Sequence, residues 1–184
     1  MKTLKENPPA HCGQDREEFY EGLRAKYAKR YKGFDVLATE AGYNLVQTWA
    51  LGDARLSAKA QERRMTLPGI NVLCILREYE QAGCPLNILS RMLLVSRANV
   101  TGLVDSLVRH KYVTRHDFAG DRRVILAKIT KSGETFLDHY LPIHYQEVGH
   151  LFSGLSAGEK QTLIKLLTKI RRSSCRHPRE KMVS

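Results

Sequence analysis

Positively charged side chains are concentrated in one stretch of this 184-residue chain. The sequence has 30 lysines and arginines against 19 aspartates and glutamates, which gives a formal net charge of +11. Between Arg91 and Lys131 there are nine basic residues and only three aspartates, so more than half of the excess lies there. Guanidinium and ammonium groups bind phosphate oxygens. The chemistry that this stretch favours is therefore binding of a polyanion, either a nucleic acid or an anionic membrane surface.

A helix is predicted over residues 97–110, inside this basic stretch. Its apolar residues recur at helical spacing and share one inward face: Val100, Leu103, Val104 and Leu107. Ser96 stands just before them, where its hydroxyl can accept a free N–H of the first turn. We therefore expect Arg97, Asn99 and Thr101 to face outward near the start of the helix.

A β-hairpin is predicted directly after this helix. Residues 112–115 and 124–129 are rich in β-branched and aromatic side chains, and 119–121 (Ala-Gly-Asp) has the composition of a turn. The tip of the hairpin then carries Arg122 and Arg123, and Arg115 lies near its opposite end. A capped helix followed by a basic hairpin is the outline of a winged helix-turn-helix.

This stretch resembles the MarR (multiple antibiotic resistance regulator) family of transcription factors. The family has a recognition helix of the form S-x-x-x-V-T-x-L-V-D-x-L and a wing of the form D-x-R-x5-L-T-x-x-G. The sequence matches the first from Ser96 and the second from Asp121 and Arg123, with Ile129 in place of leucine. Lys111 departs further, because the family usually has a glycine there to end the helix in a left-handed conformation. The resemblance extends from about residue 35 to residue 172.

The resemblance implies a homodimeric, sequence-specific regulator that binds double-stranded DNA. It would be a repressor released from an inverted-repeat operator by a small aromatic or phenolic ligand. Helix 97–110 would enter the major groove and the wing an adjacent minor groove, with Arg123 as the wing arginine and Asp121 orienting it. We expect phosphate contacts, which set register without reading sequence, from Arg91, Arg115 and Arg122. The full set of expected DNA-binding residues is Arg91, Ser96, Arg97, Asn99, Thr101, Arg115, Asp121, Arg122 and Arg123.

The predicted fold class is mainly α with a small β-hairpin wing, in which N- and C-terminal helices form a dimerisation lobe. The expected segments are 1–33 (an extension with an accessory helix), 34–65 (a dimerisation helix), 66–134 (the winged helix-turn-helix DNA-binding domain), 135–173 (C-terminal dimerisation helices) and 174–184 (a flexible tail). Residues 83–85 are expected to form a break between two helices. Asn87 is expected to cap the next helix, over 88–94. Ser156 and Glu159 form a capping box before a last helix. Broad apolar faces over 37–56 and 163–170 predict a symmetric dimer.

Trp49 and Tyr43 lie on the long helix predicted over 35–64, near where the resembled family binds aromatic acids. We expect them to contact the effector ligand, and burial of Trp49 in the core is the alternative. The accessory helix is expected to cover apolar surface on the dimer, or else to gate a ligand pocket.

Two patterns could indicate other chemistry. Residues 155–161 (LSAGEKQ) look like the signature loop of ABC-type ATPases, but the chain has no GxxxxGK[ST] loop, and a capping box explains the same residues. Four potential metal ligands fall in one helical region, but their spacing is uneven: His139, His144, Glu147 and His150. We therefore expect no metal, no cofactor and no enzymatic activity.

The four cysteines, Cys12, Cys74, Cys84 and Cys175, form no CxxC pair, which favours reduced intracellular thiols. Redox sensing through Cys12 is an open alternative, and Cys74 is expected to pack in the core. No segment has the roughly 18 consecutive apolar residues that span a bilayer, so a cytoplasmic location is expected and no membrane partner. The alternative function is a winged-helix module for protein–protein contact.

Overall fold

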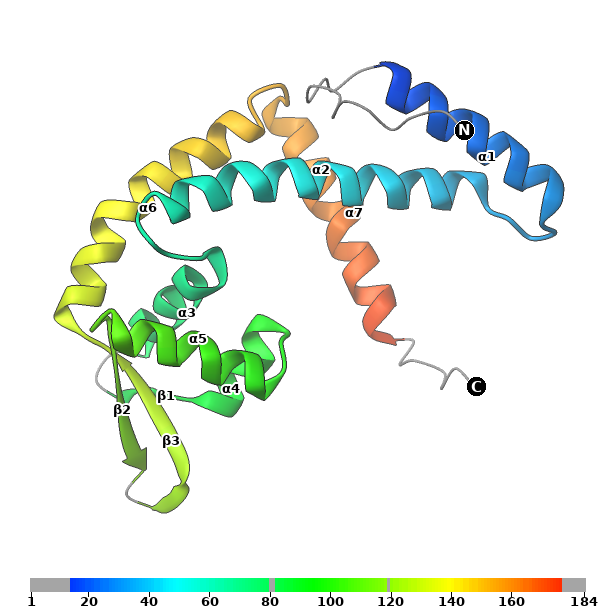
Figure 1. The fold of residues 1–184 in the computed structure, drawn as a ribbon. Helices are drawn as coiled ribbons and strands as arrows, with labels where there is room; N and C mark the ends of the chain where they lie inside the picture. The colour runs from blue at the N-terminus through cyan, green and yellow to red at the C-terminus, as the bar shows by residue number, and fades with distance from the viewer. Residues whose placement is uncertain (1–13, 80–81, 119, 177–184) are drawn as a thin grey trace, which may run out of the picture. The chain divides into compact units, whose positions relative to one another are not determined.

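The computed structural model describes residues 14–79, 82–118 and 120–176, and the chain divides into an N-terminal unit (1–52) and a C-terminal unit (53–184). It is mostly helical with one small three-stranded antiparallel sheet, which confirms the predicted fold class (Figure 1). The elements in chain order are α1 (Gln14–Arg30), α2 (Val36–Gln61), α3 (Leu67–Glu78), β1 (Cys84–Pro85), α4 (Leu86–Leu93), α5 (Arg97–Arg109), β2 (Val113–Phe118), β3 (Asp121–Ile129), α6 (Lys131–Leu151) and α7 (Ala157–Arg176).

The N-terminal unit is a hairpin of α1 and the first part of α2. Gly33 adopts a φ of 82° between the two helices, a conformation that glycine reaches without strain. The Asp35 carboxylate then accepts a hydrogen bond from the N–H of Ala38 (2.9 Å), which caps the start of α2. Arg24 on α1 pairs with Glu40 on α2 at 3.6 Å, so the two helices are joined by an ion pair.

The C-terminal unit is built around one hydrophobic core. Its fully buried side chains come from α3, α4, α5, α6 and the sheet, and include Val72, Leu73, Leu76, Leu89, Val100, Val104, Leu107, Val113, Ala127, Leu137 and Tyr140. Helix α3 begins at a Thr66 cap, whose hydroxyl accepts the N–H of Gly69 at 3.2 Å. Pro68 lies in the first turn of α3, where its missing N–H leaves no bond unmade.

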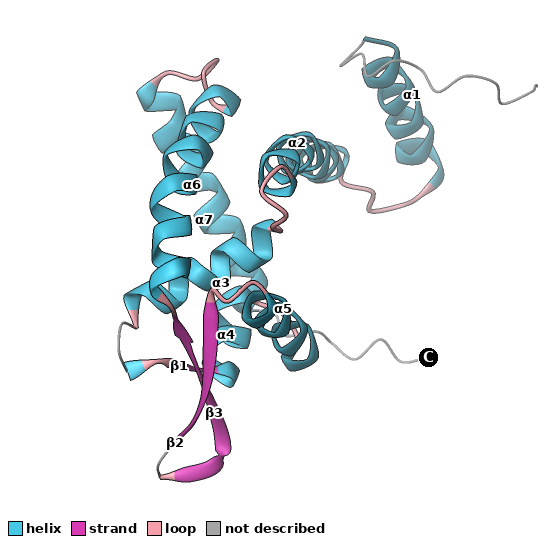
Figure 2. Cartoon of the chain, turned by 60° about the vertical axis from the view of Figure 1, so that its left-hand side comes forward, coloured by secondary structure: helices cyan, strands magenta, loops and turns pink. Residues whose placement is uncertain are grey.

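The sheet has the order β1-β3-β2, and its long β2–β3 hairpin projects beyond the helices (Figure 2). The predicted break at residues 83–85 does separate two helices, but it also contains a strand that was not predicted, because Cys84 and Pro85 pair with Ala127 and Leu126 of β3. This strand is only two residues long, too short to show an alternating pattern. The prediction that Asn87 caps a helix is also wrong, because α4 begins at Leu86 after an extended Pro85, with no side-chain cap.

Three helices of the C-terminal unit end at residues other than glycine that adopt a left-handed conformation. These residues are Arg64 (φ 56°), Leu94 (φ 55°) and Lys111 (φ 62°). After α5, the N–H of Lys111 bonds to the carbonyl of Val108 and that of Tyr112 to the carbonyl of Leu107. This is the Schellman pattern that glycine usually terminates. Lys111 therefore takes up the glycine conformation, and the turn geometry of the winged helix is preserved.

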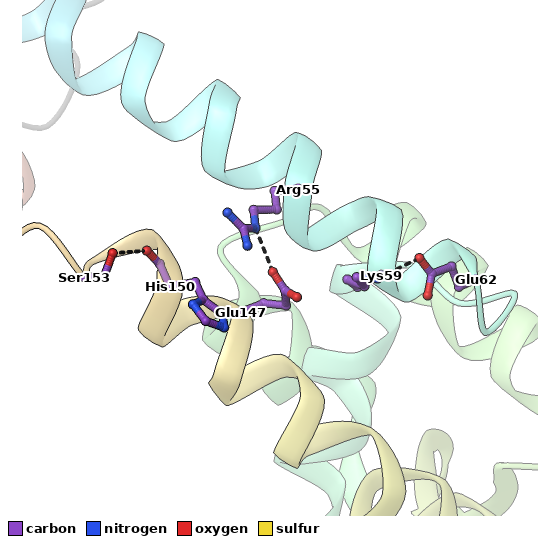
Figure 3. Close-up of polar contacts among 6 residues, drawn as sticks. All are labelled: Arg55, Lys59, Glu62, Glu147, His150 and Ser153. Carbon is purple, nitrogen blue, oxygen red and sulfur yellow. Dashed lines mark hydrogen bonds and ion pairs between the residues drawn. The ribbon is translucent and has the colours of Figure 1, made fainter. Parts of the chain in front are cut away.

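Helices α6 and α7 complete the C-terminal unit. The predicted capping box is confirmed, since the Ser156 hydroxyl accepts the N–H of Glu159 (3.3 Å) and the Glu159 carboxylate accepts that of Ser156 (2.8 Å). The end of α2 is tied to α6 by Arg55 Nε and Glu147 Oε2, 2.7 Å apart (Figure 3). The Arg55 hydrogen bond lowers the pKa of the Glu147 carboxyl, so the pair is charged at neutral pH.

Large apolar side chains remain exposed on α2 and α7 in the single chain. They are Leu37, Leu45, Val46, Trp49 and Leu51 on α2, and Ile164, Leu166 and Ile170 on α7. Among the described residues, no helix is both long and apolar enough to cross a bilayer.

Candidate nucleic-acid interface

Helix α5 presents one apolar face inward and one polar face outward, as the sequence predicts. Its inward residues Val100, Val104 and Leu107 are buried in the core. The Ser96 hydroxyl accepts the N–H of Asn99 at 3.2 Å, so the predicted cap is confirmed. Fixing one face in the core leaves the opposite one in solvent, and this exposed face carries Arg97, Asn99 and Thr101.

Two of these outward residues line a cleft between α5 and the wing. The cleft has a volume of about 300 Å³ and is lined by Leu86, Asn87, Arg97, Thr101, Val124 and Ile125. Thr101 also donates its hydroxyl hydrogen to the carbonyl of Arg97 at 3.0 Å. Its side-chain oxygen therefore has only acceptor capacity left for an outside group.

Arg115 on β2 is engaged by α5. Its Nη1 lies 2.7 Å from Asp105 Oδ1, and its Nη2 donates to the carbonyl of Thr101 at 3.3 Å. The sequence favours a phosphate contact for Arg115, whereas the structure gives its guanidinium two acceptors within the protein. Sequence reasoning missed Asp105, because a helix residue and a strand residue ten positions apart share no periodic pattern.

The remaining predicted residues lie on three elements. Arg122 and Arg123 follow Asp121 as the second and third residues of β3, and Asp121 pairs with Phe118 next to the turn. The register of the hairpin shifts between Asp117 and Phe118, which marks an irregularity close to its tip. Arg91 is exposed in the last turn of α4.

The base of the wing is fastened to both neighbouring helices through Thr130. Its hydroxyl donates to the carbonyl of Lys111 (2.8 Å) and accepts the N–H of Gly133 (3.1 Å). Its own N–H bonds to the carbonyl of Tyr112 at 2.9 Å. Gly133 packs against the same carbonyl so closely that a Cβ there would lie 2.5 Å from the oxygen of Tyr112. The end of α5, the base of the wing and the start of α6 are thus held together.

A row of aromatic rings continues from this junction along α6. Ring centroids lie 5.0 Å apart between Tyr112 and Phe136, 5.6 Å between Phe136 and Tyr140, and 5.8 Å between Tyr140 and His144. The Tyr140 hydroxyl and the His144 Nδ1 are buried and have no hydrogen-bond partner among the described residues. Burial raises the pKa of the Tyr140 phenol and lowers the pKa of the His144 imidazole.

The two predicted ligand contacts lie in different surroundings. Tyr43 lines a cleft of about 560 Å³ between α1 and α2, which is also lined by Tyr20, Glu21, Arg24, Val36, Glu40, Asn44 and Gln47. The rings of Tyr20 and Tyr43 lie 5.2 Å apart. Trp49 is 66% exposed in the single chain, so burial in the core of one chain, the alternative for this residue, is wrong.

Metal binding and thiol reactivity, the other chemistries considered from the sequence, find little support among the described residues. In the described ranges, no group of three or more His, Cys, Asp or Glu side chains is close enough to hold a metal ion. His139 instead bonds through Nδ1 to the carbonyl of Thr135 at 2.7 Å. Cys74 packs against the core, half-buried, and burial raises its thiol pKa, which disfavours the reactive thiolate. Cys12 and the tail beyond residue 176 lie outside the described residues.

Known proteins that are similar to this chain are transcriptional regulators. Residues 65–125 match the model of the MarR family. The transcriptional regulator YkoM of Bacillus subtilis is 42% identical over 80 residues, which are 44% of this chain and 51% of YkoM. The chain thus spans about half of that relative. The transcriptional repressor MprA of Escherichia coli is 29% identical over 146 residues, 78% of this chain and 81% of MprA.

A solved structure extends the likeness from sequence to fold. Bordetella bronchiseptica BpsR, whose DNA binding is regulated by 6-hydroxynicotinic acid, aligns with a TM-score of 0.65 at 25% identity. The alignment covers 71% of this chain and 91% of BpsR. The matched residues include α3, β1, α4, α5, β2 and the start of β3, so the match takes in the recognition-helix pattern and the first part of the wing. On its fold and on these matches, residues 65–125 form a winged helix-turn-helix region of the MarR family.

Proposed function

We infer that the chain is a sequence-specific DNA-binding regulator that acts as a transcriptional repressor. The main support is the geometry of α5, whose outward face carries Arg97, Asn99 and Thr101 beside a basic wing fastened to the same helix. A helix fits the major groove of DNA, and side chains near its start can reach base edges there. The wing carries Arg122 and Arg123 toward an adjacent minor groove, and Arg91 contacts a phosphate.

Selection of bound sequences from a random duplex pool tests this function. An inverted repeat is expected, since two copies of one recognition helix read the same half-site. The affinity of the protein for this repeat should fall as the salt concentration rises, with a log-log slope of about −0.9 for each phosphate neutralised. Recovery of no preferred sequence, with binding insensitive to salt, would instead favour a winged helix used for contact with another protein.

We also place a small-molecule effector on the N-terminal unit. The cleft between α1 and α2 combines the Tyr20–Tyr43 ring pair with the guanidinium of Arg24, so it offers a stacking contact and one ionic contact to a planar aromatic acid. The precedent is the ligand regulation of BpsR. Trp49 is the only tryptophan and lies on the same helix as Tyr43, so its fluorescence is the probe chosen to detect ligand binding.

Titration with 6-hydroxynicotinic acid is a direct test of this effector site. Saturable quenching of Trp49 fluorescence and weaker operator binding are expected in the parent protein, and both should be lost in Tyr43→Ala. Tyr145→Ala is a matched control, because it removes an exposed tyrosine from α6. An unchanged ligand response in Tyr43→Ala would place the effector elsewhere.

A further inference from the structure

One arginine joins the two elements that are proposed to enter DNA grooves. Arg115 lies on β2, the first strand of the wing, and both of its protein acceptors lie on α5. These acceptors, the Thr101 carbonyl and the Asp105 carboxylate, are four residues apart and therefore lie on the same side of the helix, one turn from each other. A single guanidinium thus spans one turn of α5.

The backbone of Arg115 is held in place by its pairing in the sheet, so its contact with α5 has a defined direction. Arg115 pairs across the sheet with Ala127 of β3, and Ala127 is fully buried in the core. The backbone on which Arg115 stands is therefore fixed at this point. A planar guanidinium with two engaged N–H groups fixes orientation as well as distance, which a lysine ammonium cannot do.

We propose that Arg115 is a positioning residue, and that Asp105 holds it so that the wing keeps a fixed angle to the recognition helix. The proposal rests on the DNA-binding function inferred above. It assigns Arg115 and Asp105 to the alignment of the two groove contacts, in place of a phosphate contact by Arg115. The pair is partly exposed, with 32% of the Arg115 and 44% of the Asp105 side chain accessible. Ion pairs this exposed add little to folding stability, so their removal is expected to leave the fold intact.

The substitution Asp105→Asn distinguishes a phosphate contact by Arg115 from a positioning role, because the two roles predict opposite changes in operator affinity. It removes a negative charge from a surface that approaches DNA and releases the guanidinium. If Arg115 bound a phosphate, operator affinity would stay equal or rise. If Asp105 orients Arg115, operator affinity falls about tenfold, the order expected when a groove contact is lost. Glu62→Gln is the matched control, because it also removes one carboxylate charge from an exposed ion pair, which joins Lys59 in the last turn of α2 to Glu62 just after the helix.

The salt dependence of binding gives a second readout. A phosphate contact by Arg115 would make the log-log salt slope of Arg115→Ala shallower by about 0.9. A positioning role predicts weaker operator binding with the slope nearly unchanged. The charge-exchanged variant Asp105→Arg/Arg115→Asp should recover part of the affinity that either single substitution loses. A failure of this variant to recover affinity would count against the pair.

A double-mutant cycle with the wing completes the test. If the pair acts by placing Arg123, Arg123→Ala should cost less affinity in the Asp105→Asn background than in the parent protein. Additive losses would show that the pair and the wing act independently, and would overturn the proposal. A parent protein that selects no DNA sequence would instead refute the DNA-binding function, whatever the variants do. Thermal melting of each variant confirms that it is folded.

Discussion

At the scale of single residues, burial controls the chemistry of two neighbouring side chains on α6. Tyr140 is 1% exposed, and its hydroxyl has no partner in the described part of the chain. His144 lies one turn later with a buried and unpaired Nδ1. A polar group taken from water without a new hydrogen bond destabilises the folded state. Both residues therefore lower stability relative to apolar rings of the same shape.

Replacement of Tyr140 by phenylalanine is expected to raise the free energy of unfolding by about 1 kcal/mol, because the unpaired hydroxyl is removed and the ring contacts remain. Urea denaturation measures the change. Tyr145→Phe is the control, since Tyr145 is 64% exposed and its hydroxyl is solvated in the single chain. A loss of stability in Tyr140→Phe would mean that the hydroxyl has a partner.

His144 predicts a dependence of stability on pH. Burial lowers its pKa in the folded chain, so below the unfolded value of about 6.5 the unfolded chain binds a proton that the folded chain does not. The parent protein should therefore lose stability relative to His144→Phe as the pH falls from about 6.5 toward the lowered pKa. Above that range the difference between the two proteins should be constant. Denaturation curves at several pH values measure this difference, and a constant difference throughout would contradict the prediction.

At the scale of elements, local signals predicted two of the helix starts correctly and failed at Asn87, where α4 begins one residue earlier. The cap at Ser96 and the capping box at Ser156 were predictable, because each depends on residues three positions apart. The hairpin after α5 was predictable from the turn residues between two runs rich in β-branched side chains. Strand β1 was not predictable, since its two residues become a strand only by pairing with β3. The contact between Asp105 and Arg115 was missed for the same reason, because the folded chain brings a helix against a strand.

Gly102 offers a test of the outward face of α5. A Cβ there would meet nothing within 4 Å, so Gly102→Ala should raise the free energy of unfolding by about 1 kcal/mol through helix propensity alone. Gly102 lies one residue past Thr101 and three past Asn99, on the side proposed to approach DNA. Operator affinity should therefore fall while stability rises, because a methyl group blocks close approach of the backbone.

Gly149→Ala is the matched control for this substitution. Gly149 lies on α6, and a Cβ there also meets nothing within 4 Å. A similar rise in stability is expected, without a change in operator affinity. An unchanged affinity in Gly102→Ala would show that the backbone at this point stays away from the DNA.

At the scale of the whole molecule, α2 and α7 each expose large apolar side chains in the single chain. Leu37 is 78% exposed, Trp49 66% and Ile164 62% in the single chain. Contiguous apolar patches are uncommon on monomers and mark interaction surfaces. We propose that a second copy covers them across a two-fold axis. Two recognition helices related in this way lie roughly 34 to 36 Å apart, one turn of DNA.

Removal of residues 156–184 tests this assembly. The truncated chain lacks α7 and its exposed apolar residues, so dimerisation and tight operator binding should be lost together, leaving weak non-specific binding. Sedimentation at micromolar concentration measures the mass, and a 21.0 kDa species for the intact chain would contradict a dimer. Circular dichroism of the truncated chain checks that the remaining helices are folded.

The close contact at Gly133 limits which mutations its codon can tolerate. Every amino-acid change that a single-base substitution makes in a glycine codon introduces a Cβ, and a Cβ at Gly133 would overlap the Tyr112 carbonyl and lie 2.8 Å from Ile129 Cγ1. No missense change at this codon leaves the junction between wing and α6 intact. If the chain is the repressor proposed above, a genetic screen for derepressed colonies is expected to recover several different alleles at this one codon, each with Arg122 and Arg123 unaltered.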